Sequence, residues 1–172
     1  MSFPPVNASS ADAPTIPPRG FVLGPDDGDP YYWLGSLTLN KVSPAASRGG
    51  FDIVDHRVPR GYAPPRHVHL TQDEVFYLID GQLKVQCGSD VWEAGPGSLV
   101  FLPRGIAHGF TVSDAGPART LLINAPAGFA DMIVELGTPA TALALPGDDV
   151  PLPDPARLAA VFQAHGITVF PE

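Results

Sequence analysis

The amino-acid sequence predicts an all-β protein built as an antiparallel sandwich or barrel. Short stretches rich in β-branched and aromatic residues recur along the chain, and turn-forming pairs such as Asp80-Gly81 separate them. Hydrophobic residues make up 44% of the 172 residues and charged residues only 16%, which excludes a disordered chain. A chain of this length can bury one sizeable core, so we expect a single domain.

The expected strands are short, and most are separated by groups of glycine, proline or aspartate residues. In chain order they cover residues 20–23, 36–42, 51–58, 74–79, 82–87, 91–93, 98–102, 109–112 and 119–124. Apolar residues at helical spacing predict one helix over residues 128–136, closed by Gly137. A second helix is expected over residues 155–164, with Asp154 as its N-cap and Pro155 in its first turn.

The two ends of the chain differ in composition from the segment that holds the strands. Residues 1–18 are rich in proline, serine and alanine, which predicts a flexible N-terminal arm available to wrap a partner subunit. Residues 19–137 contain the expected strands and the first helix, and we assign the barrel to them. Residues 138–172 are expected to form a C-terminal extension with one helix.

The charge and the cysteine content exclude several classes of protein. A net charge of -8 and a pI of about 4.9 argue against nucleic-acid or anionic-membrane partners. The first residues lack the basic and apolar regions of a signal peptide, and no apolar run approaches the roughly 20 residues of a membrane span. A single cysteine, Cys87, excludes an internal disulfide. These features predict a cytoplasmic protein.

Two groups of spaced residues carry the chemistry of the chain. The first reads G-x5-H-x-H-x4-E-x6-G and consists of Gly61, His67, His69, Glu74 and Gly81. The second reads G-x5-P-x-G-x2-H and consists of Gly97, Pro103, Gly105 and His108. Three imidazoles and one carboxylate suit a borderline divalent metal: iron, nickel, manganese, cobalt, copper or zinc.

The spacing of these residues has a structural reason. Alternate side chains of a strand share a face, so His67 and His69 point the same way. Glu74 would face away on the same unbroken strand, so residues 70–73 have to turn or bulge to bring its carboxylate back. His108 comes from a later strand. If all four side chains bound one metal ion that prefers five or six ligands, positions would stay open, which favours a catalytic site over a closed structural one.

Together the two groups resemble the two-part signature of the cupin family. The resemblance implies a double-stranded β-helix, the jelly-roll barrel of that family, with His67, His69, Glu74 and His108 as ligands of one metal ion. It also implies a homodimer. The asparagine that usually closes the signature would fall at Val112, and this chain lacks it, which makes the expected pocket more apolar.

Within the family, the chain is similar to small quercetinase-like cupins in its segments Pro64-Pro65-Arg66-His67-Val68-His69 and Asp73-Glu74-Val75-Phe76-Tyr77. This similarity implies a metal-dependent dioxygenase that acts on a flavonol or a related hydroxylated aromatic or enolic substrate. Glu74 would then also accept the substrate's hydroxyl proton. Two alternatives stay open: a non-oxidative metal enzyme, such as an isomerase or decarboxylase, and a binding module without catalysis.

Strand alternation also predicts the lining of the pocket. Phe76 and Leu78 share the face of Glu74, and Phe110 and Val112 share the face of His108. We therefore expect an apolar cavity, which suits an aromatic small molecule better than a sugar. His56 is expected to be a hydrogen-bonded or surface histidine rather than a pocket residue.

Overall fold

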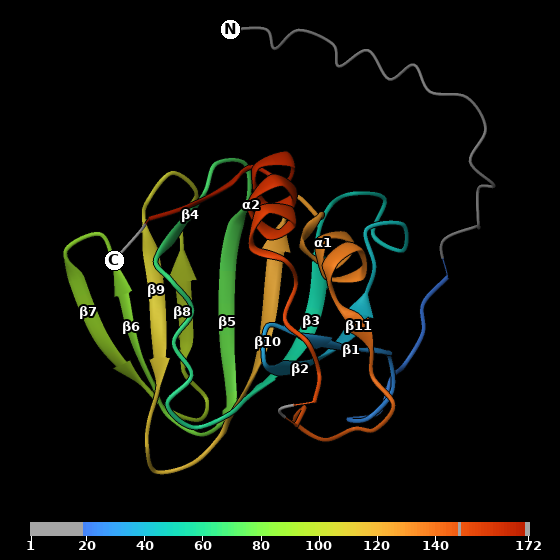
Figure 1. The fold of residues 1–172 in the computed structure, drawn as a ribbon, viewed down its shortest axis with the longest axis horizontal. Helices are drawn as coiled ribbons and strands as arrows, with labels where there is room; N and C mark the ends of the chain where they lie inside the picture. Colours follow the sequence, from blue (N-terminus) through green and yellow to red (C-terminus); the bar gives the residue numbers. More distant parts are fainter. Residues whose placement is uncertain (1–18, 148, 171–172) are drawn as a thin grey trace, which may run out of the picture.

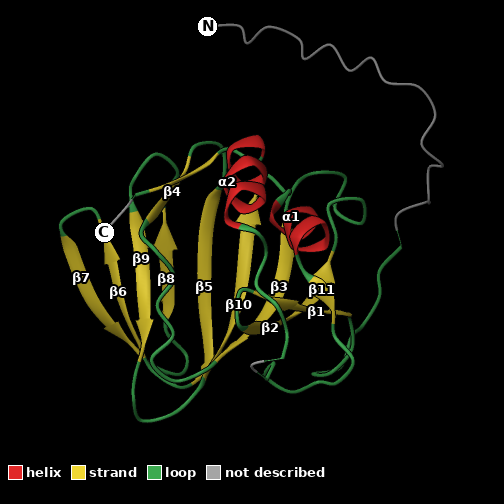
Figure 2. Ribbon diagram, in the orientation of Figure 1, coloured by secondary structure: helices red, strands yellow, loops and turns green. Residues whose placement is uncertain are grey.

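The computed structural model describes residues 19–147 and 149–170, and the predicted N-terminal arm of residues 1–18 lies outside these ranges. Two antiparallel sheets make up most of the described chain, with two short helices at one end (Figures 1 and 2). The all-β architecture expected from the sequence is therefore confirmed. Neither described helix is long and apolar enough to cross a membrane.

The larger sheet has seven strands, and its central strands lie beside one another in Figure 1. Its spatial order is β11 (Thr138–Pro139), β1 (Asp29–Trp33), β2 (Ser36–Val42), β3 (Asp52–Val58), β10 (Ala118–Ala125), β5 (Asp73–Asp80) and β8 (Leu99–Leu102). All pairs are antiparallel. Burial alternates residue by residue along β10, which shows that one face of this sheet is covered and the other is open.

The smaller sheet has five strands, with β7 at its far edge (Figure 1). Its order is β12 (Ile167–Val169), β4 (His67–His69), β9 (His108–Val112), β6 (Leu83–Cys87) and β7 (Asp90–Ala94). The turn from β5 to β6 requires a glycine at position 81, because its φ is 81° and a Cβ atom there would lie 2.5 Å from the carbonyl oxygen of Pro117. This is the Asp80-Gly81 turn that the sequence predicted.

The helices α1 (Phe129–Leu136) and α2 (Pro155–Ala164) agree with the sequence-based expectation. Asp154 caps α2 by accepting hydrogen bonds from the backbone nitrogens of Ala156 and Arg157. The start of α1 is held by a residue far away in the chain. The buried carboxylate of Asp52, on β3, accepts hydrogen bonds from the backbone nitrogens of Gly128 and Ala130 at 2.7 and 3.1 Å.

Some elements differ from the expectation. Residues 20–23 form no strand, and both edges of β2, the next predicted strand, are paired with β1 and β3. The sequence analysis named no strand over β1, β11 or β12, which are interrupted by proline or are only two or three residues long. The last of these, β12, pairs with β4 and so brings the end of the described chain next to His67 and His69.

Side chains rather than strand pairing hold the segment just before β1. The Lys41 ammonium donates to the carbonyl oxygens of Gly24 and Pro25, both at 3.0 Å. The guanidinium groups of Arg57 and Arg119 also donate to Pro25, at 3.0 and 2.9 Å. This segment therefore lies across the open face of the larger sheet.

One buried carboxylate lies among these three cations. Asp55 is only 1% exposed, and its Oδ2 atom lies 2.6 Å from Arg119 and 3.9 Å from Lys41. Its Oδ1 atom lies 3.4 Å from the Nε atom of Arg57. Without Asp55, three positive charges would face one another with little access to water.

We therefore expect Asp55→Ala to lower the free energy of unfolding by about 3–5 kcal/mol, since it leaves partly buried cations without their partner. Urea denaturation monitored by circular dichroism measures this loss. Asp26→Ala is the matched control, because Asp26 also pairs with Arg57 but its side chain is 64% exposed. That variant should lose less than about 1 kcal/mol. Equal losses in the two variants would contradict the role assigned to Asp55.

Candidate metal centre

Three histidines of the signature come from two paired strands of the smaller sheet. His67 and His69 are the first and last residues of β4, so they share a face as the sequence predicted. His108 begins β9, and its Cα position lies directly opposite His67 in the antiparallel pairing. The three imidazoles are therefore placed together by strand register alone.

The carboxylate reaches them from the facing sheet. Residues 70–72 carry the chain from β4, in the smaller sheet, to β5, in the larger one. Glu74 is the second residue of β5 and is buried. The turn expected between His69 and Glu74 is thus a crossing between the two sheets, and it lets one short segment supply ligand atoms from both sides of the barrel.

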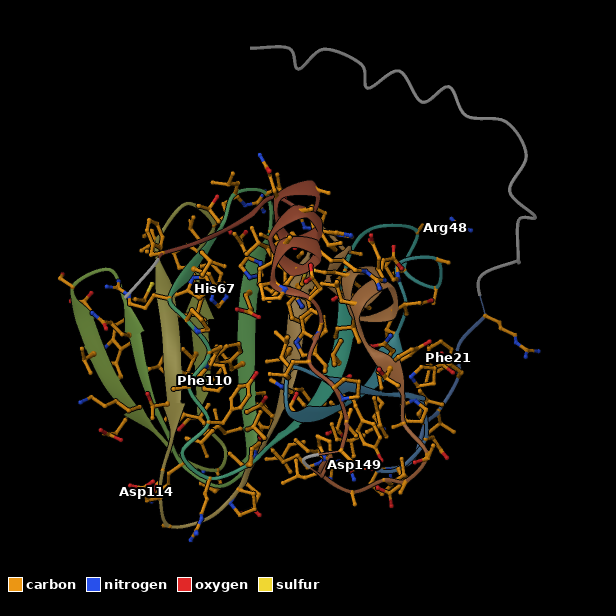
Figure 3. The ribbon with its side chains drawn as sticks, viewed as in Figure 1. Phe21, Arg48, His67, Phe110, Asp114 and Asp149 are labelled. Atoms are coloured by element: carbon orange, nitrogen blue, oxygen red, sulfur yellow. The ribbon has the colours of Figure 1, made fainter. Side chains whose placement is uncertain are left out.

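The four side chains converge to the distances of a single ion-binding site. One nitrogen or oxygen atom from each of His67, His69, Glu74 and His108 lies within 4.8 Å of the others. The ring centroids of His67 and His108 are 4.7 Å apart, and those of His67 and His69 are 5.2 Å apart. Figure 3 shows His67 between the two sheets, near the end of the barrel where the helices lie.

Backbone carbonyl groups determine which ring nitrogen of two histidines is free. The Nδ1 atom of His67 lies 2.9 Å from the carbonyl oxygen of Pro65, and that of His108 lies 2.9 Å from the carbonyl oxygen of Ile106. A carbonyl oxygen only accepts, so each Nδ1 carries the hydrogen and donates it. Each Nε2 atom then keeps a lone pair, which is the form of imidazole that binds a metal.

Several polar atoms of this cluster have no partner. Among the described residues, no hydrogen bond reaches either ring nitrogen of His69, the Oε2 atom of Glu74 or the Nε2 atom of His108. Glu74 Oε2 and His108 Nε2 nevertheless lie 3.3 Å apart. Two lone pairs at this distance repel unless a cation or a proton lies between them. The cluster therefore suits a single metal ion.

The ionisation of the cluster in the absence of metal is compatible with this conclusion. Burial raises the pKa of the Glu74 carboxyl, but the close contact with His108 and the nearby imidazoles of His69 and His67 outweigh burial and bring this pKa to about 2. Burial lowers the pKa of His67 to about 4 and also lowers that of His69. At neutral pH this gives a negative carboxylate beside neutral imidazoles, the protonation state that metal ligands need.

The surroundings of His69 hold its ring in place. The ring of Phe129, at the start of α1, stacks against it with a centroid distance of 6.0 Å and an interplanar angle of 26°. The side chain of Gln72 lies near His69 and partly offsets the lowering of the His69 pKa by burial. The amide nitrogen of Gln72 donates to the carbonyl oxygen of Pro126 at 3.0 Å. Because Asp52 anchors the first turn of α1, it also positions Phe129 against the cluster.

A cavity of about 250 Å³ adjoins the cluster, and His67 and Glu74 form part of its wall. This volume is near the lower end of the range of roughly 300–1,000 Å³ found for small-molecule sites. Most of the wall is apolar and comes from both sheets and both helices: Trp33, Leu34, Pro64, Pro65, Phe76, Phe110, Leu122, Phe129, Met132, Pro155, Leu158, Ala159, Phe162, Ile167 and Val169.

The residues predicted to line the pocket divide into two pairs. Phe76 and Phe110 lie in the cavity wall, and their rings meet edge to face with centroids 5.5 Å apart. Figure 3 shows Phe110 in the barrel interior, farther from the helical end than His67. Leu78 and Val112 are buried in the hydrophobic core and do not line this cavity. They share the inward face, as expected, but lie deeper in the barrel.

Two polar residues in the wall were not expected there. His56, on β3, is 5% exposed and lines the cavity, as does Tyr62 from the segment after β3. Strand alternation puts His56 on the same face as Val54 and Val58, and both valines are buried. That alternation was the available signal for an inward-facing histidine, but it did not show which part of the interior is hollow.

Comparisons with known proteins agree with this geometry. Residues 55–124, which include all four cluster residues, match the family described as Cupin domain. The chain also resembles the polyketide cyclase RemF from Streptomyces resistomycificus, with 18% identity, a TM-score of 0.55, and coverage of 76% of this chain and 89% of that chain. The fold is the cupin double-stranded β-helix. This confirms the fold class expected from the sequence.

Other structures show the same cupin fold. KdgF from Halomonas sp. is 16% identical, with a TM-score of 0.52 and coverage of 59% of this chain and 89% of that chain. Oxalate decarboxylase from Bacillus subtilis is 20% identical, with a TM-score of 0.52, and the match covers 64% of this chain but only 31% of the enzyme. No curated protein matches the chain. These matches support membership of the cupin superfamily. The named proteins have different activities, so the matches do not indicate a reaction for this chain.

The burial of His56 leads to a prediction about pH. Burial lowers the pKa of His56 to about 4, whereas an unfolded histidine titrates near 6.5. Between these values the unfolded chain binds more protons, so stability falls as the pH falls. From about pH 7 to about pH 5, wild-type protein should lose about 2 kcal/mol more of its unfolding free energy than His56→Gln.

Urea denaturation of metal-free protein at each pH measures this difference. His165→Gln is the matched control, because His165 lies outside the cavity wall and its side chain pairs with the exposed carboxylate of Glu135, so its replacement should change the unfolding free energy by less than about 1 kcal/mol at each pH. Parallel pH profiles for wild type and His56→Gln would contradict a buried neutral His56.

Proposed function

We propose that His67, His69, Glu74 and His108 bind one divalent transition metal and that the cavity beside them holds a small-molecule substrate. The observation that carries this proposal is a buried cluster of three imidazoles and one carboxylate, with unpartnered ligand atoms, that borders an apolar cavity. Iron, nickel, manganese, cobalt, copper and zinc all accept this ligand set, and their availability decides between them.

Metal content tests the first half of the proposal. Gently purified wild-type protein should contain about one metal ion per chain, and His67→Ala and His108→Ala should each lose at least 10-fold in metal affinity. Elemental analysis, followed by titration of metal-free protein, measures both quantities. His165→Ala is the control and should bind as the wild type does. A wild-type chain that binds no metal, or alanine variants that bind equally well, would refute the site.

For the reaction, we propose oxygenation by dioxygen of a flavonol or a related hydroxylated aromatic or enolic compound. The apolar wall suits an aromatic ring system, because it offers few partners for the many hydroxyl groups of a sugar. A divalent transition metal in the cluster would supply the Lewis acidity that acidifies a substrate hydroxyl and the electron transfer that dioxygen chemistry requires.

The chain itself supplies a proton acceptor and a dry environment. Glu74 is ionised at neutral pH and forms part of the cavity wall, so its carboxylate is available to accept the proton of a bound hydroxyl. Its pKa of about 2 makes it a weak base, so it suits only a substrate hydroxyl that has been made more acidic. Phe76 and Phe110 form an apolar part of the same cavity wall, which would limit the water beside the reacting groups.

Oxygen consumption tests the reaction. Metal-loaded protein should consume dioxygen with members of a panel of flavonols and enolisable diketones, and Glu74→Gln should lower the turnover about 100-fold or more, because the amide cannot accept the proton. A Clark electrode measures uptake, and elemental analysis of the variant separates lost chemistry from lost metal. Glu135→Gln, at an exposed position on α1, is the matched control.

Other outcomes of the same assay distinguish the alternatives. No uptake with any substrate of the panel would refute the dioxygenase. Turnover under strict anaerobiosis would instead support a non-oxidative enzyme, such as an isomerase or decarboxylase. A ligand that raises the melting temperature and is recovered unchanged would support a binding module without catalysis.

The homodimer implied by the resemblance also stays a proposal. The open face of the larger sheet carries several exposed apolar side chains, on neighbouring strands β5 and β8: Tyr77, Ile79, Leu99 and Phe101. A contiguous apolar surface of this kind is typical of faces that bind another protein surface.

A further inference from the structure

His56 lies in the cavity wall at a distance from the metal cluster. Its Cα position is opposite Thr120 on β10, whereas that of Glu74 is opposite Asn124 on the same strand. The two positions are thus offset by four residues, about 13 Å, along β10, and the two side chains enter the cavity wall from the strands on either side of it. The aromatic rings of Phe76 and Phe110 lie between them: Phe110 is 6.4 Å from His56 and 5.5 Å from Phe76 by ring centroids.

A chain of hydrogen bonds determines the tautomer of His56. The hydroxyl of Ser36 lies 2.5 Å from the carbonyl oxygen of Trp33, to which it donates its only hydrogen. The Nε2 atom of His56 lies 2.9 Å from the same hydroxyl oxygen. Since the hydroxyl hydrogen is already used, Nε2 has to donate, and Nδ1 keeps an unprotonated lone pair. The turn between β1 and β2, where Trp33 pairs with Ser36, holds the whole relay in place.

The Nδ1 atom of His56 is buried and accepts no hydrogen bond from the described residues. Burial keeps the ring neutral at physiological pH, so this nitrogen is an acceptor and not a donor. A buried polar atom without a partner costs free energy, which a bound donor group would recover. The rings of Tyr62 and His56 meet edge to face, with centroids 6.2 Å apart. Burial raises the pKa of the Tyr62 hydroxyl to about 12, so this hydroxyl stays protonated.

We propose that His56 accepts a hydrogen bond from a hydroxyl group at the end of the ligand that is remote from the metal cluster. The inference rests on the proposed function, since it takes the other end of the ligand to lie at His67 and Glu74. It narrows the substrate class to aromatic compounds of two or three rings. Such a compound would carry one hydroxyl group at the end beside His67 and Glu74 and at least one further hydroxyl group several ångströms away.

Ligand affinity tests this assignment without any turnover. The probes are 3-hydroxyflavone and its two derivatives with one further hydroxyl group, at position 7 or at position 4′. They are titrated under nitrogen into protein loaded with the metal found by elemental analysis. At least one derivative should bind wild-type protein about 3- to 10-fold more tightly than the parent compound, the gain expected of one net hydrogen bond. In His56→Phe this ratio should fall to about one.

The affinity ratio separates recognition from a structural role, because a general disturbance of the cavity would weaken all three compounds alike. His165→Phe is the matched control and should keep the wild-type ratio. A ratio that is unchanged in His56→Phe would overturn the proposal, as would failure of all three compounds to bind wild-type protein. Tight binding with the expected ratio but no oxygen uptake would refute the oxygenation and leave the role of His56 intact.

If His56→Phe does not fold, nitrogen NMR of the wild-type protein tests the same assignment. The spectrum should show the Nε2-protonated tautomer of His56, and its Nδ1 resonance should shift when the tighter-binding derivative is added but not with the parent compound. An Nδ1-protonated tautomer would overturn the proposal. So would an Nδ1 shift of the same size with the parent compound, because that compound lacks the further hydroxyl group.

Discussion

Every polar atom inside this barrel needs a partner, because the space between the two sheets is otherwise filled with aliphatic and aromatic side chains. Most inward-facing polar groups find one in the backbone or in a neighbouring strand, as Asp52 does at the start of α1. Among the described residues, both ring nitrogens of His69, the Oε2 atom of Glu74 and the Nε2 atom of His108 find no partner, and this arrangement suits a cation. Because the interior is apolar, it offers few hydrogen-bond partners to the side chains of His67, His69, Glu74 and His108.

Strand register and backbone carbonyls position the residues of the cluster. His67 faces His108 because β4 and β9 pair antiparallel, and each ring is oriented by a carbonyl oxygen two residues earlier in the chain. Glu74 comes from the opposite sheet, so the cluster also joins the two halves of the barrel. His56, Glu74 and the rings of Phe76 and Phe110 all line the same cavity.

The sequence was a good guide where the evidence was periodic or part of a motif. Alternation located most of the long strands, and the signature located the four cluster residues. Alternation identifies a face but not a depth, so Leu78 and Phe76 could not be distinguished, although only Phe76 lines the cavity. The acceptor role inferred for His56 depends on Ser36 and Trp33, which a hairpin brings to it from another part of the chain. No local pattern encodes that contact.

The neighbouring residues Asp55 and His56 show how the outside of the larger sheet constrains its inside. They point to opposite faces of β3, one into a group of three cations and the other into the cavity wall. A slip of β3 by a single residue would exchange them, exposing the imidazole and placing an unpaired carboxylate among aromatic rings. The ion pairs of Asp55 on the outer face therefore favour the register of β3 in which the neutral imidazole of His56 faces the cavity.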